Sequence, residues 1–213
     1  MPYIANDVVD WKDPANAQKS RDSRYLKKIL TAAEIEFVRG SRNPDVTLWS
    51  LWACKETAYK VISKSSASAA FLPRRWPVKL NQEAFTPVDG EIVIPEQNKV
   101  FVQLLIAESY VHCIGSDNLS VLGKIIRGVD RLPPSEEEKI VDPSQFGRTC
   151  LIRRLAVLDN LNFAALSIRR TQKDGELQPP CVYLDNKEAP FDISLSHDGQ
   201  FTAYAFIKKS GLI

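Results

Sequence analysis

Three charged residues, Lys55, Glu56 and Lys60, lie within a stretch of sequence whose apolar spacing predicts a helix. At about 100° per residue, one arc of this helix carries Leu48, Leu51, Trp52, Tyr59 and Ile62. Lys55 falls in the middle of that arc, and Glu56 and Lys60 fall together at its margin. Such a pair is often an exposed salt bridge, and a lysine can extend its ammonium group into solvent. A carboxylate and two ammonium groups beside aromatic side chains also suit an anionic substrate with a metal ion, and we favour this second interpretation.

Two acids near the start of the chain are candidates for binding that metal. Asp7 lies in the apolar stretch 3–9, which predicts a strand, and Asp10 follows three residues later. An acid inside a strand is costly to bury unless something pairs with it. It is therefore either a strand-end acid that caps a turn or a ligand for Mg²⁺, which prefers one or two carboxylates with water and phosphate oxygens.

A second polar motif ends a predicted strand near the other end of the chain. Ser194 and Ser196 share one face of that strand by alternation, and His197 follows them. Two hydroxyls followed by a histidine can bind phosphate, although the same pattern also occurs at polar hairpin ends. The sequence offers no second histidine nearby for a proton relay, so a Ser–His hydrolase is poorly supported.

The elements that must position these residues are of mixed type, which predicts an α+β fold. Helices are expected at 46–63 and 150–158, and Thr31-Ala32-Ala33-Glu34 has the form of a capping box that opens another. A short helix is expected to begin at 135–140. Strands are expected at 100–107, 110–114, 165–169, 192–196 and 201–207. The strands at 100–107 and 110–114 are expected to form one hairpin, and those at 192–196 and 201–207 another.

The chain also predicts two similar halves. Each half contains a Gly turn, at Asp89-Gly90-Glu91 and at Asp174-Gly175-Glu176, followed by a terminal hairpin. An aromatic residue, Tyr110 or Phe201, precedes the second strand of each hairpin. We divide the chain into a first half at 1–118, a connecting segment at 119–147 and a second half at 148–213.

The overall composition excludes several classes of protein. The net charge of +2 gives no general attraction to nucleic acid or membrane surfaces. The four cysteines form no CxxC pair, which disfavours structural zinc, and Cys54 and Cys113 read as buried thiols. The sequence shows neither a signal peptide nor an apolar run long enough to span a membrane, so we expect a cytoplasmic protein.

Taken together, the motifs resemble those of the 4′-phosphopantetheinyl transferases. Ala5-Asn6-Asp7-Val8-Val9-Asp10 is similar to the G-x-D-x-V-E strand of the holo-acyl-carrier-protein synthase branch. Trp52-Ala53-Cys54-Lys55-Glu56-Thr57-Ala58-Tyr59-Lys60 looks like the W/F-x-x-K-E-x-x-x-K helix, which is the family's most specific signature. Ile193-Ser194-Leu195-Ser196-His197 is similar to the strand that ends in S-x-S-H. The resemblance covers residues 1–64 and 148–207.

The sequence departs from the family pattern at several positions. The usual Gly before the first acid is missing from Ala5-Asn6, and Asp10 replaces a Glu. The Gly-Lys-Pro turn that helps to hold coenzyme A appears as Gly175-Glu176-Leu177, without its lysine. A second G-x-D string, Gly128-Val129-Asp130, precedes two prolines and is expected outside any strand.

The resemblance implies a 4′-phosphopantetheinyl transferase-like fold, with two similar halves forming a pseudo-dimer in one chain. It implies Mg²⁺-dependent transfer of 4′-phosphopantetheine from coenzyme A to a serine of an acyl or peptidyl carrier protein. Asp7 and Glu56, with Asp10 as a further candidate, would hold the metal. Glu56 would be the base for the carrier serine, and Lys60 would stabilise the departing 3′,5′-ADP. The residues assigned to the phosphates of coenzyme A are Lys55, Arg153, Ser196 and His197.

We expect a monomer whose partners are coenzyme A and a carrier protein. The basic residues Arg21, Arg24, Lys27 and Lys28 could meet an acidic carrier helix or form a solvated helix face. One alternative is a binding or regulatory protein of the same fold without transfer activity, motivated by the altered first motif and the missing lysine. Another is a Mg²⁺-dependent phosphatase or nucleotidyl enzyme of a different fold, which would need a further acid cluster.

Overall fold

The computed structural model describes residues 2–66, 69–81, 87–95, 99–134, 141–173 and 175–209. The helices, with η for 3₁₀ helices, are η1 (Lys19–Arg21), α1 (Ser23–Ile29), α2 (Ala32–Gly40), α3 (Pro44–Ser65), η2 (Pro73–Arg75), α4 (Leu119–Leu122), α5 (Pro143–Leu158) and η3 (Phe163–Ala165). The strands are β1 (Ile4–Asp10), β2 (Val78–Leu80), β3 (Val88–Ile92), β4 (Val100–Ile106), β5 (Tyr110–Ser116), β6 (Ile126–Arg131), β7 (Leu166–Arg169), β8 (Gln172–Lys173), β9 (Glu176–Leu177), β10 (Cys181–Leu184), β11 (Lys187–Glu188), β12 (Phe191–Asp198) and β13 (Phe201–Lys208). The helix expected at 135–140, and Asp174 of the turn expected in the second half, lie outside the described residues.

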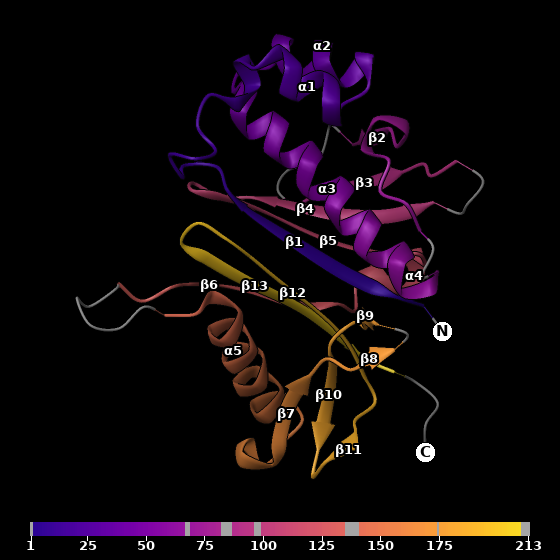
Figure 1. Ribbon diagram of the computed structural model, residues 1–213, viewed down its shortest axis with the longest axis vertical. Coiled ribbons are helices and arrows are strands. Elements are labelled where there is room, and N and C mark those ends of the chain that lie inside the picture. Colours follow the sequence, from indigo (N-terminus) through magenta and orange to yellow (C-terminus); the bar gives the residue numbers. More distant parts are fainter. Residues whose placement is uncertain are drawn as a thin grey trace.

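The first layer is a five-stranded antiparallel sheet in the order β1-β5-β4-β3-β2, covered on one face by α3 (Figure 1). Helix α3 begins where the side chain of Asn43 accepts the N–H of Val46 and Pro44 occupies the first turn. Its apolar arc packs onto β1, β5 and β4, with Leu48, Leu51 and Ala58 fully buried in the core. The site residues of α3 are therefore held against β1 by this core.

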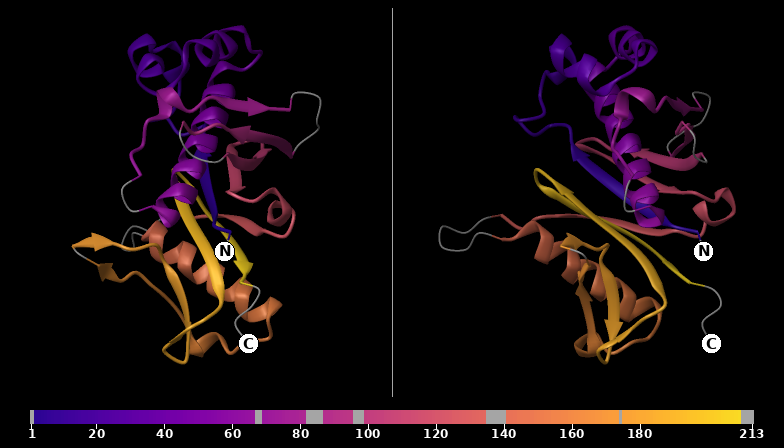
Figure 2. Two further views of the ribbon diagram at one scale, coloured as in Figure 1. Left: turned by 90° about the vertical axis from the view of Figure 1, so that its right-hand side faces the viewer. Right: turned by 45° about the vertical axis from the view of Figure 1, so that its right-hand side comes forward.

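The second layer is a three-stranded antiparallel sheet in the order β12-β13-β6, and α5 packs on its outer face (Figure 2). Leu151 and Leu155 of α5 contact Ile193 and Phe206 of the hairpin in a separate core. Gly147 makes this packing possible, because a Cβ there would collide with the Thr202 hydroxyl of β13. A smaller sheet, β11-β10-β7, completes this side of the molecule.

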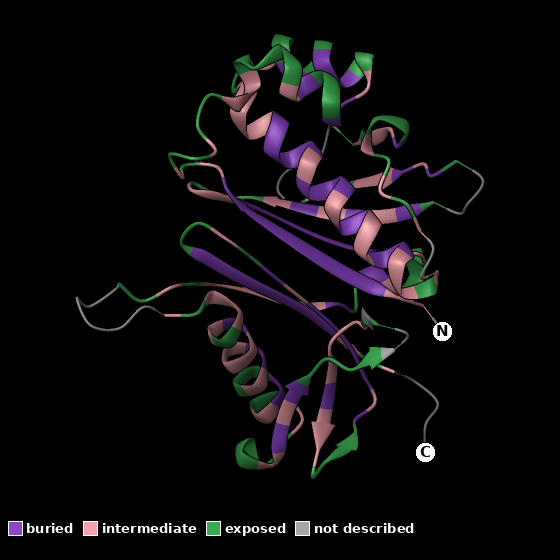
Figure 3. Ribbon diagram, viewed as in Figure 1, coloured by how far each residue is buried: buried purple, intermediate pink, exposed green. Residues whose placement is uncertain are grey.

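The two sheets face each other through β1, which is buried along its whole length between α3 and the β12–β13 hairpin (Figure 3). Odd-numbered β1 residues such as Ala5 and Val9 belong to the α3 core, whereas Ile4 and Val8 pack against Ala205 and Ala203 of β13. This alternation decides which side of the molecule each polar residue of β1 can reach.

Both β1 and β12 are edge strands, and side chains rather than backbone pairing join them. The bonds run from Ile4 N to Asp192 Oδ2 (2.7 Å), from Asn6 N to Ser194 Oγ (3.0 Å) and from Asp10 N to Asp198 Oδ2 (2.8 Å). We call this row of contacts the β1–β12 seam. It satisfies outward N–H groups that an exposed edge would leave open to pairing with another chain.

A buried ion pair reinforces the β1–β12 seam. Lys64 Nζ lies 2.7 Å from Asp192 Oδ1 and also donates to the carbonyl oxygens of Ile4 (2.6 Å) and Ile193 (2.8 Å). The side chains of Lys64 and Asp192 are only 7% and 11% exposed. The C-terminal part of α3 is thereby fixed to both edge strands.

The structure confirms the α+β fold class and most of the predicted elements. The capping box of Thr31 and Glu34 is present, both predicted hairpins form, and the thiols of Cys54 and Cys113 are buried. The similarity of the two halves and their boundaries stay predictions. No helix of the described residues combines the length and apolarity needed to cross a membrane.

Two predictions about glycines were wrong. Gly90 is not in a turn but inside β3, where a Cβ would come within 2.6 Å of the Lys79 carbonyl oxygen. The string from Gly128 to Asp130 lies within β6 and pairs with β13, and a Cβ at Gly128 would collide with the ring of Tyr204. In both places the glycine serves close packing rather than chain reversal.

Candidate active site

Asp7 and Lys60 form the centre of the site. Asp7 is an odd-numbered residue of β1, so its side chain points towards α3, and its Oδ1 lies 2.7 Å from Lys60 Nζ. Lys60 also donates to the Asn6 carbonyl oxygen at 3.2 Å. Burial raises the pKa of Asp7, and this effect outweighs the lowering by Lys60. One lysine therefore does not fully compensate the carboxylate.

Glu56 lies one helical turn before Lys60, on the same half-exposed stripe of α3. Burial, together with the negative charge of Asp7, raises the pKa of Glu56 to about 7, against the opposing effect of Lys60. The structure thus brings together three predicted site residues, the two carboxyl groups of Asp7 and Glu56 and the ammonium group of Lys60. A carboxylate with a pKa near neutrality can accept a proton from a substrate at physiological pH.

The structure places the Asp10 side chain apart from this group. As an even-numbered residue it points to the opposite side of β1, where Oδ2 accepts the Gln200 N–H at 3.1 Å and Oδ1 accepts the Lys12 N–H at 3.2 Å. Gly199, with φ of 52°, allows this approach, since a Cβ there would lie 2.5 Å from Asp10 Oδ2. Asp10 is the turn-capping acid that the alternative interpretation described.

The structure places the Lys55 ammonium group in the protein interior rather than beside Asp7 and Lys60. The Lys55 side chain has no exposed surface, and its ammonium group donates to Glu34 Oε2 (2.7 Å), the Pro73 carbonyl oxygen (2.7 Å) and the Ile29 carbonyl oxygen (3.2 Å). All three donor hydrogens of the ammonium are therefore used inside the protein. Lys55 holds α2, α3 and η2 together.

We call Asp7, Glu56 and Lys60 the acid–lysine group. A cleft of about 400 Å³ runs beside Lys60 of this group. One wall is the α3 stripe that contains Tyr59, Lys60 and Ser63, and another is β12 at residues 193–195. The third wall comes from the segment around β9, with Leu177 and Arg170. Asp7 and Glu56 do not line the cleft themselves; Lys60 does, and it joins the cleft to Asp7 through their ion pair.

A second cavity of about 180 Å³ adjoins the cleft and shares Arg170, Pro180 and Leu195 with it. Its other wall is formed by the first two turns of α5, including Arg148, and His197 lies at its β12 side. Arg148 Nε is buried and has no hydrogen-bond partner among the described residues. His197 also lowers the pKa of Asp7, as a minor electrostatic effect. The two cavities together present several cationic groups to an anionic ligand.

Arg153 does not line either cavity. It lies five residues after Arg148 on α5, so its side chain points about 140° away around the helix, and it is exposed. The sequence missed Arg148 and Arg170 as candidates. The signal for Arg148 was its position next to Gly147, the glycine that lets the first turn of α5 approach β13.

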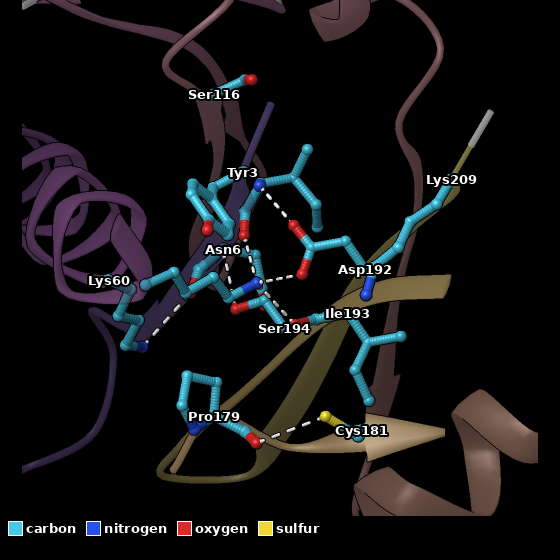
Figure 4. A network of polar contacts seen from close by, with 12 residues as sticks. Tyr3, Asn6, Lys60, Ser116, Pro179, Cys181, Asp192, Ile193, Ser194 and Lys209 are labelled. Atoms are coloured by element: carbon cyan, nitrogen blue, oxygen red, sulfur yellow. Dashed lines mark hydrogen bonds and ion pairs between the residues drawn. The ribbon is translucent and has the colours of Figure 1, made fainter. Parts of the chain in front are cut away.

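Ser194 points from β12 towards Asn6 of β1, and its Oγ accepts the Asn6 N–H at 3.0 Å (Figure 4). Ser196, on the same face of β12, accepts a hydrogen bond at Oγ from Asn6 Nδ2 at 2.8 Å. Both hydroxyls therefore contact the residue that precedes Asp7, and Ser196 also lines the second cavity. The predicted phosphate-binding motif meets the acid motif across the β1–β12 seam.

The site contains two clustered acids rather than a complete metal cage. Over the described ranges, no group of three or more His, Cys, Asp or Glu side chains is arranged to hold a metal ion. Asp7 and Glu56 match what Mg²⁺ takes from a protein when phosphates and water supply the remaining ligands.

Comparison with protein-family models matches residues 3–112 to the 4′-phosphopantetheinyl transferase superfamily. The match contains β1 and α3, and therefore all three residues of the acid–lysine group. Members of this superfamily generally use Mg²⁺ and coenzyme A, and their partners are carrier proteins. No curated protein matches the chain.

Proposed function

Because this chain belongs to the 4′-phosphopantetheinyl transferase superfamily, we propose that it transfers 4′-phosphopantetheine from coenzyme A to a serine of an acyl or peptidyl carrier protein. One observation carries the proposal: Asp7, Glu56 and Lys60 meet beside a cleft with cationic walls. Coenzyme A is an anion with a pyrophosphate and a further phosphate, so such a cleft complements its charge.

The two acids fit a Mg²⁺ ion, since burial removes both carboxyl groups from water and raises their pKa values, and a bound cation would stabilise their charged forms. Asp7 and Glu56 would hold the ion, with phosphate oxygens and water as its other ligands. When bound, the ion would supply charge neutralisation at the pyrophosphate.

Glu56 and Lys60 have separate tasks in the transfer. Glu56, directly or through a water molecule, would take the proton of the carrier serine as its oxygen attacks the β-phosphorus of coenzyme A. A new serine–phosphorus bond forms, and the bond from that phosphorus to the oxygen bridging to 3′,5′-ADP breaks. The departing oxygen carries the developing charge, and the Lys60 ammonium stabilises it by a charge-assisted hydrogen bond.

The nucleotide phosphates would lie on the side of Arg148, Arg170 and His197. Arg170 lines both cavities and so can contact a ligand that spans them. It supplies a cation close to the turn at Gly175, where the family pattern has a lysine that this chain lacks. The missing lysine thus has a candidate replacement from a neighbouring strand end.

The carrier would approach near the N-terminal end of α3. Arg24, Lys27 and Lys28 of α1 are exposed. Lys28 also lines an apolar cavity of about 570 Å³ with Trp52 and Phe71, and no acid lines it. A basic rim around apolar side chains complements an acidic amphipathic helix.

The decisive experiment incubates the protein with coenzyme A, Mg²⁺ and a panel of apo-carrier proteins and then weighs the carriers. At least one carrier should gain the mass of one phosphopantetheine group. E56Q should lose about 100-fold or more in rate, because its amide cannot accept the proton. The matched control is E36Q, whose glutamate pairs with Arg39 on the surface of α2. No mass gain on any carrier, or a fully active E56Q, would contradict the proposal.

Variants of three arginines test where the phosphates lie. R148A and R170A should each raise the KM for coenzyme A about tenfold with little change in kcat, because they remove binding that is equal in the ground and transition states. R153A, on the exposed side of α5, should behave like the wild type. Steady-state kinetics at saturating carrier measure both constants. A raised KM for coenzyme A in R153A alone would restore the sequence-based assignment of Arg153 to the phosphates.

A further inference from the structure

The residue before Asp7 is a fully buried asparagine that contacts three other elements. The Asn6 N–H donates to Ser194 Oγ at 3.0 Å, and its carbonyl oxygen accepts Lys60 Nζ at 3.2 Å. The Asn6 side-chain amide donates to Ser196 Oγ at 2.8 Å and lies 3.2 Å from His112 Nε2. Asn6 therefore links α3, β5 and β12 at the position next to the catalytic acid.

His112 is the second buried member of this cluster. It lies on β5 opposite Val8, on the face of the sheet that packs against the β12–β13 hairpin, and it is 0% exposed. Burial, with the nearby charges of Arg127 and Lys60, lowers the pKa of His112 to about 3. The imidazole is therefore neutral at pH 7, and it accepts at Nε2 from the Asn6 amide when its proton is on Nδ1.

These contacts matter because no backbone ladder fixes the distance between β1 and β12. Asp7 lies on one of these strands and the Ser196–His197 end on the other. Their separation depends on the side chains that fill the β1–β12 seam. Small displacements of reacting groups can cost about 100-fold in rate, so the spacing of these strands bears directly on the site.

We propose that Asn6, His112 and Ser196, which we call the inter-sheet cluster, are positioning residues that set the spacing between the acid strand β1 and the phosphate-side strand β12. The assignment of the two strands to metal and phosphate rests on the proposed function, whereas the spacing role does not. A glycine at position 6 would leave the Ser196 hydroxyl and the His112 ring without this partner in a buried interface, and an unpaired buried polar group destabilises the packing around it.

Four variants separate the cluster from general damage to the core. N6G removes the side-chain amide, and H112F removes the acceptor while it keeps an aromatic ring. H112Q is the conservative variant, because its side-chain oxygen can stand in for Nε2. The matched control is S116A, whose serine is also fully buried on β5. Within the described part of the chain its hydroxyl bonds to Asp117 and the Asn118 N–H rather than to the inter-sheet cluster.

The first readout is hydrogen exchange of the Asn6 and Asp10 amides in the ligand-free protein. Both N–H groups donate across the β1–β12 seam, so they report its spacing without reference to any substrate. H112F should exchange at least about tenfold faster at both amides, whereas H112Q and S116A should remain close to wild type. Unchanged exchange in H112F, or equally fast exchange in S116A, would overturn the proposal.

The second readout is the affinity for 3′,5′-ADP by calorimetry without a carrier. N6G and H112F should bind this probe at least about tenfold more weakly, H112Q should regain most of the affinity, and S116A should match the wild type. Wild-type protein that binds no 3′,5′-ADP would contradict the proposed function. The hydrogen-exchange rates would then be the sole test of whether the cluster sets the spacing of the strands. Normal binding by folded N6G and H112F would contradict the link between spacing and site.

The chain has only two histidines, His112 and His197, so imidazole ¹⁵N spectra can be assigned with H197Q alone. The His112 signals should show the neutral Nδ1–H form at pH 7 and should change in N6G. A neutral Nε2–H form, or a charged ring, would contradict the hydrogen bond on which the cluster depends.

Discussion

At the scale of single residues, the chemistry of the site depends on how burial changes two carboxylates. Asp7 and Glu56 are both destabilised as anions by desolvation, and the Lys60 ammonium group lowers the pKa of each only in part. A cation that binds between the two carboxylates is attracted by both of them. The same arrangement keeps Glu56 half-protonated near neutral pH, so protons and Mg²⁺ compete for one group.

This competition predicts a pH dependence. Below its pKa of about 7, Glu56 carries a proton that must leave before the ion binds. The affinity for Mg²⁺ should therefore rise as pH increases towards 7 and level off above it, and kcat/KM should follow. Calorimetry in buffers of different ionisation enthalpy measures the released proton, and E36Q serves as the control. A Mg²⁺ affinity that is constant between about pH 5.5 and 7.5 would refute this assignment.

Single-residue roles were predictable where spacing along one element decided them. Glu56 and Lys60 lie four residues apart on one helix, so their proximity follows from the sequence. Lys55 was correctly placed in the apolar arc, but its partners Glu34 and Pro73 come from other elements and were invisible to periodicity. Arg148 and Arg170 enter the cavities only because distant segments meet there.

At the scale of elements, α3 presents two faces with separate tasks. Its half-exposed stripe contains Glu56 and Lys60, while its buried arc contains Lys55. The bounds of α3 and both hairpins were predictable because caps, turn residues and periodicity are local signals. The start of α5 was not, since this helix begins at Pro143 rather than at residue 150. The pairing of β6 with β13 was not, since it joins segments about 75 residues apart and depends on the close contact between Gly128 and Tyr204.

The structural role of Lys55 gives a prediction for this element. K55M removes one partner of a buried ion pair with Glu34 and should destabilise the protein by about 3–5 kcal/mol. The folded variant should still bind 3′,5′-ADP within about twofold of wild type, because the ammonium group does not reach the cleft. Urea unfolding and calorimetry give the two quantities. A large loss of affinity at unchanged stability would return Lys55 to the phosphate site.

At the scale of the whole molecule, the site exists because two sheets meet. The acids come from residues 7 and 56, and the phosphate-side groups come from residues 148–197. The Tyr110 and Phe201 rings, which begin the second strands of the two hairpins, contact each other at a centroid distance of 4.8 Å. This contact supports our proposal of two related halves, each with a helix on an antiparallel sheet. The order of the motifs suggested the proposal, but only packing could show that β1 and β12 adjoin.

The β1–β12 seam predicts that the two halves unfold together. D192N leaves the Lys64 ammonium buried without its anionic partner and should cost about 3–5 kcal/mol. D159N, in the exposed pair with Lys208 at the same 2.7 Å distance, should cost less than about 1 kcal/mol. All four tryptophans lie at or before residue 76, so fluorescence reports the first half, whereas far-UV circular dichroism reports both.

In urea, the two signals should coincide for the wild type and for D159N. They should separate for D192N, because the first half then loses the contact that couples it to the hairpin. If D192N unfolds in one transition with the midpoint of D159N, the buried pair does not hold the halves together. The hydrogen bonds and apolar contacts between β1 and the β12–β13 hairpin would then be sufficient to keep Asp7 beside the phosphate side of the site.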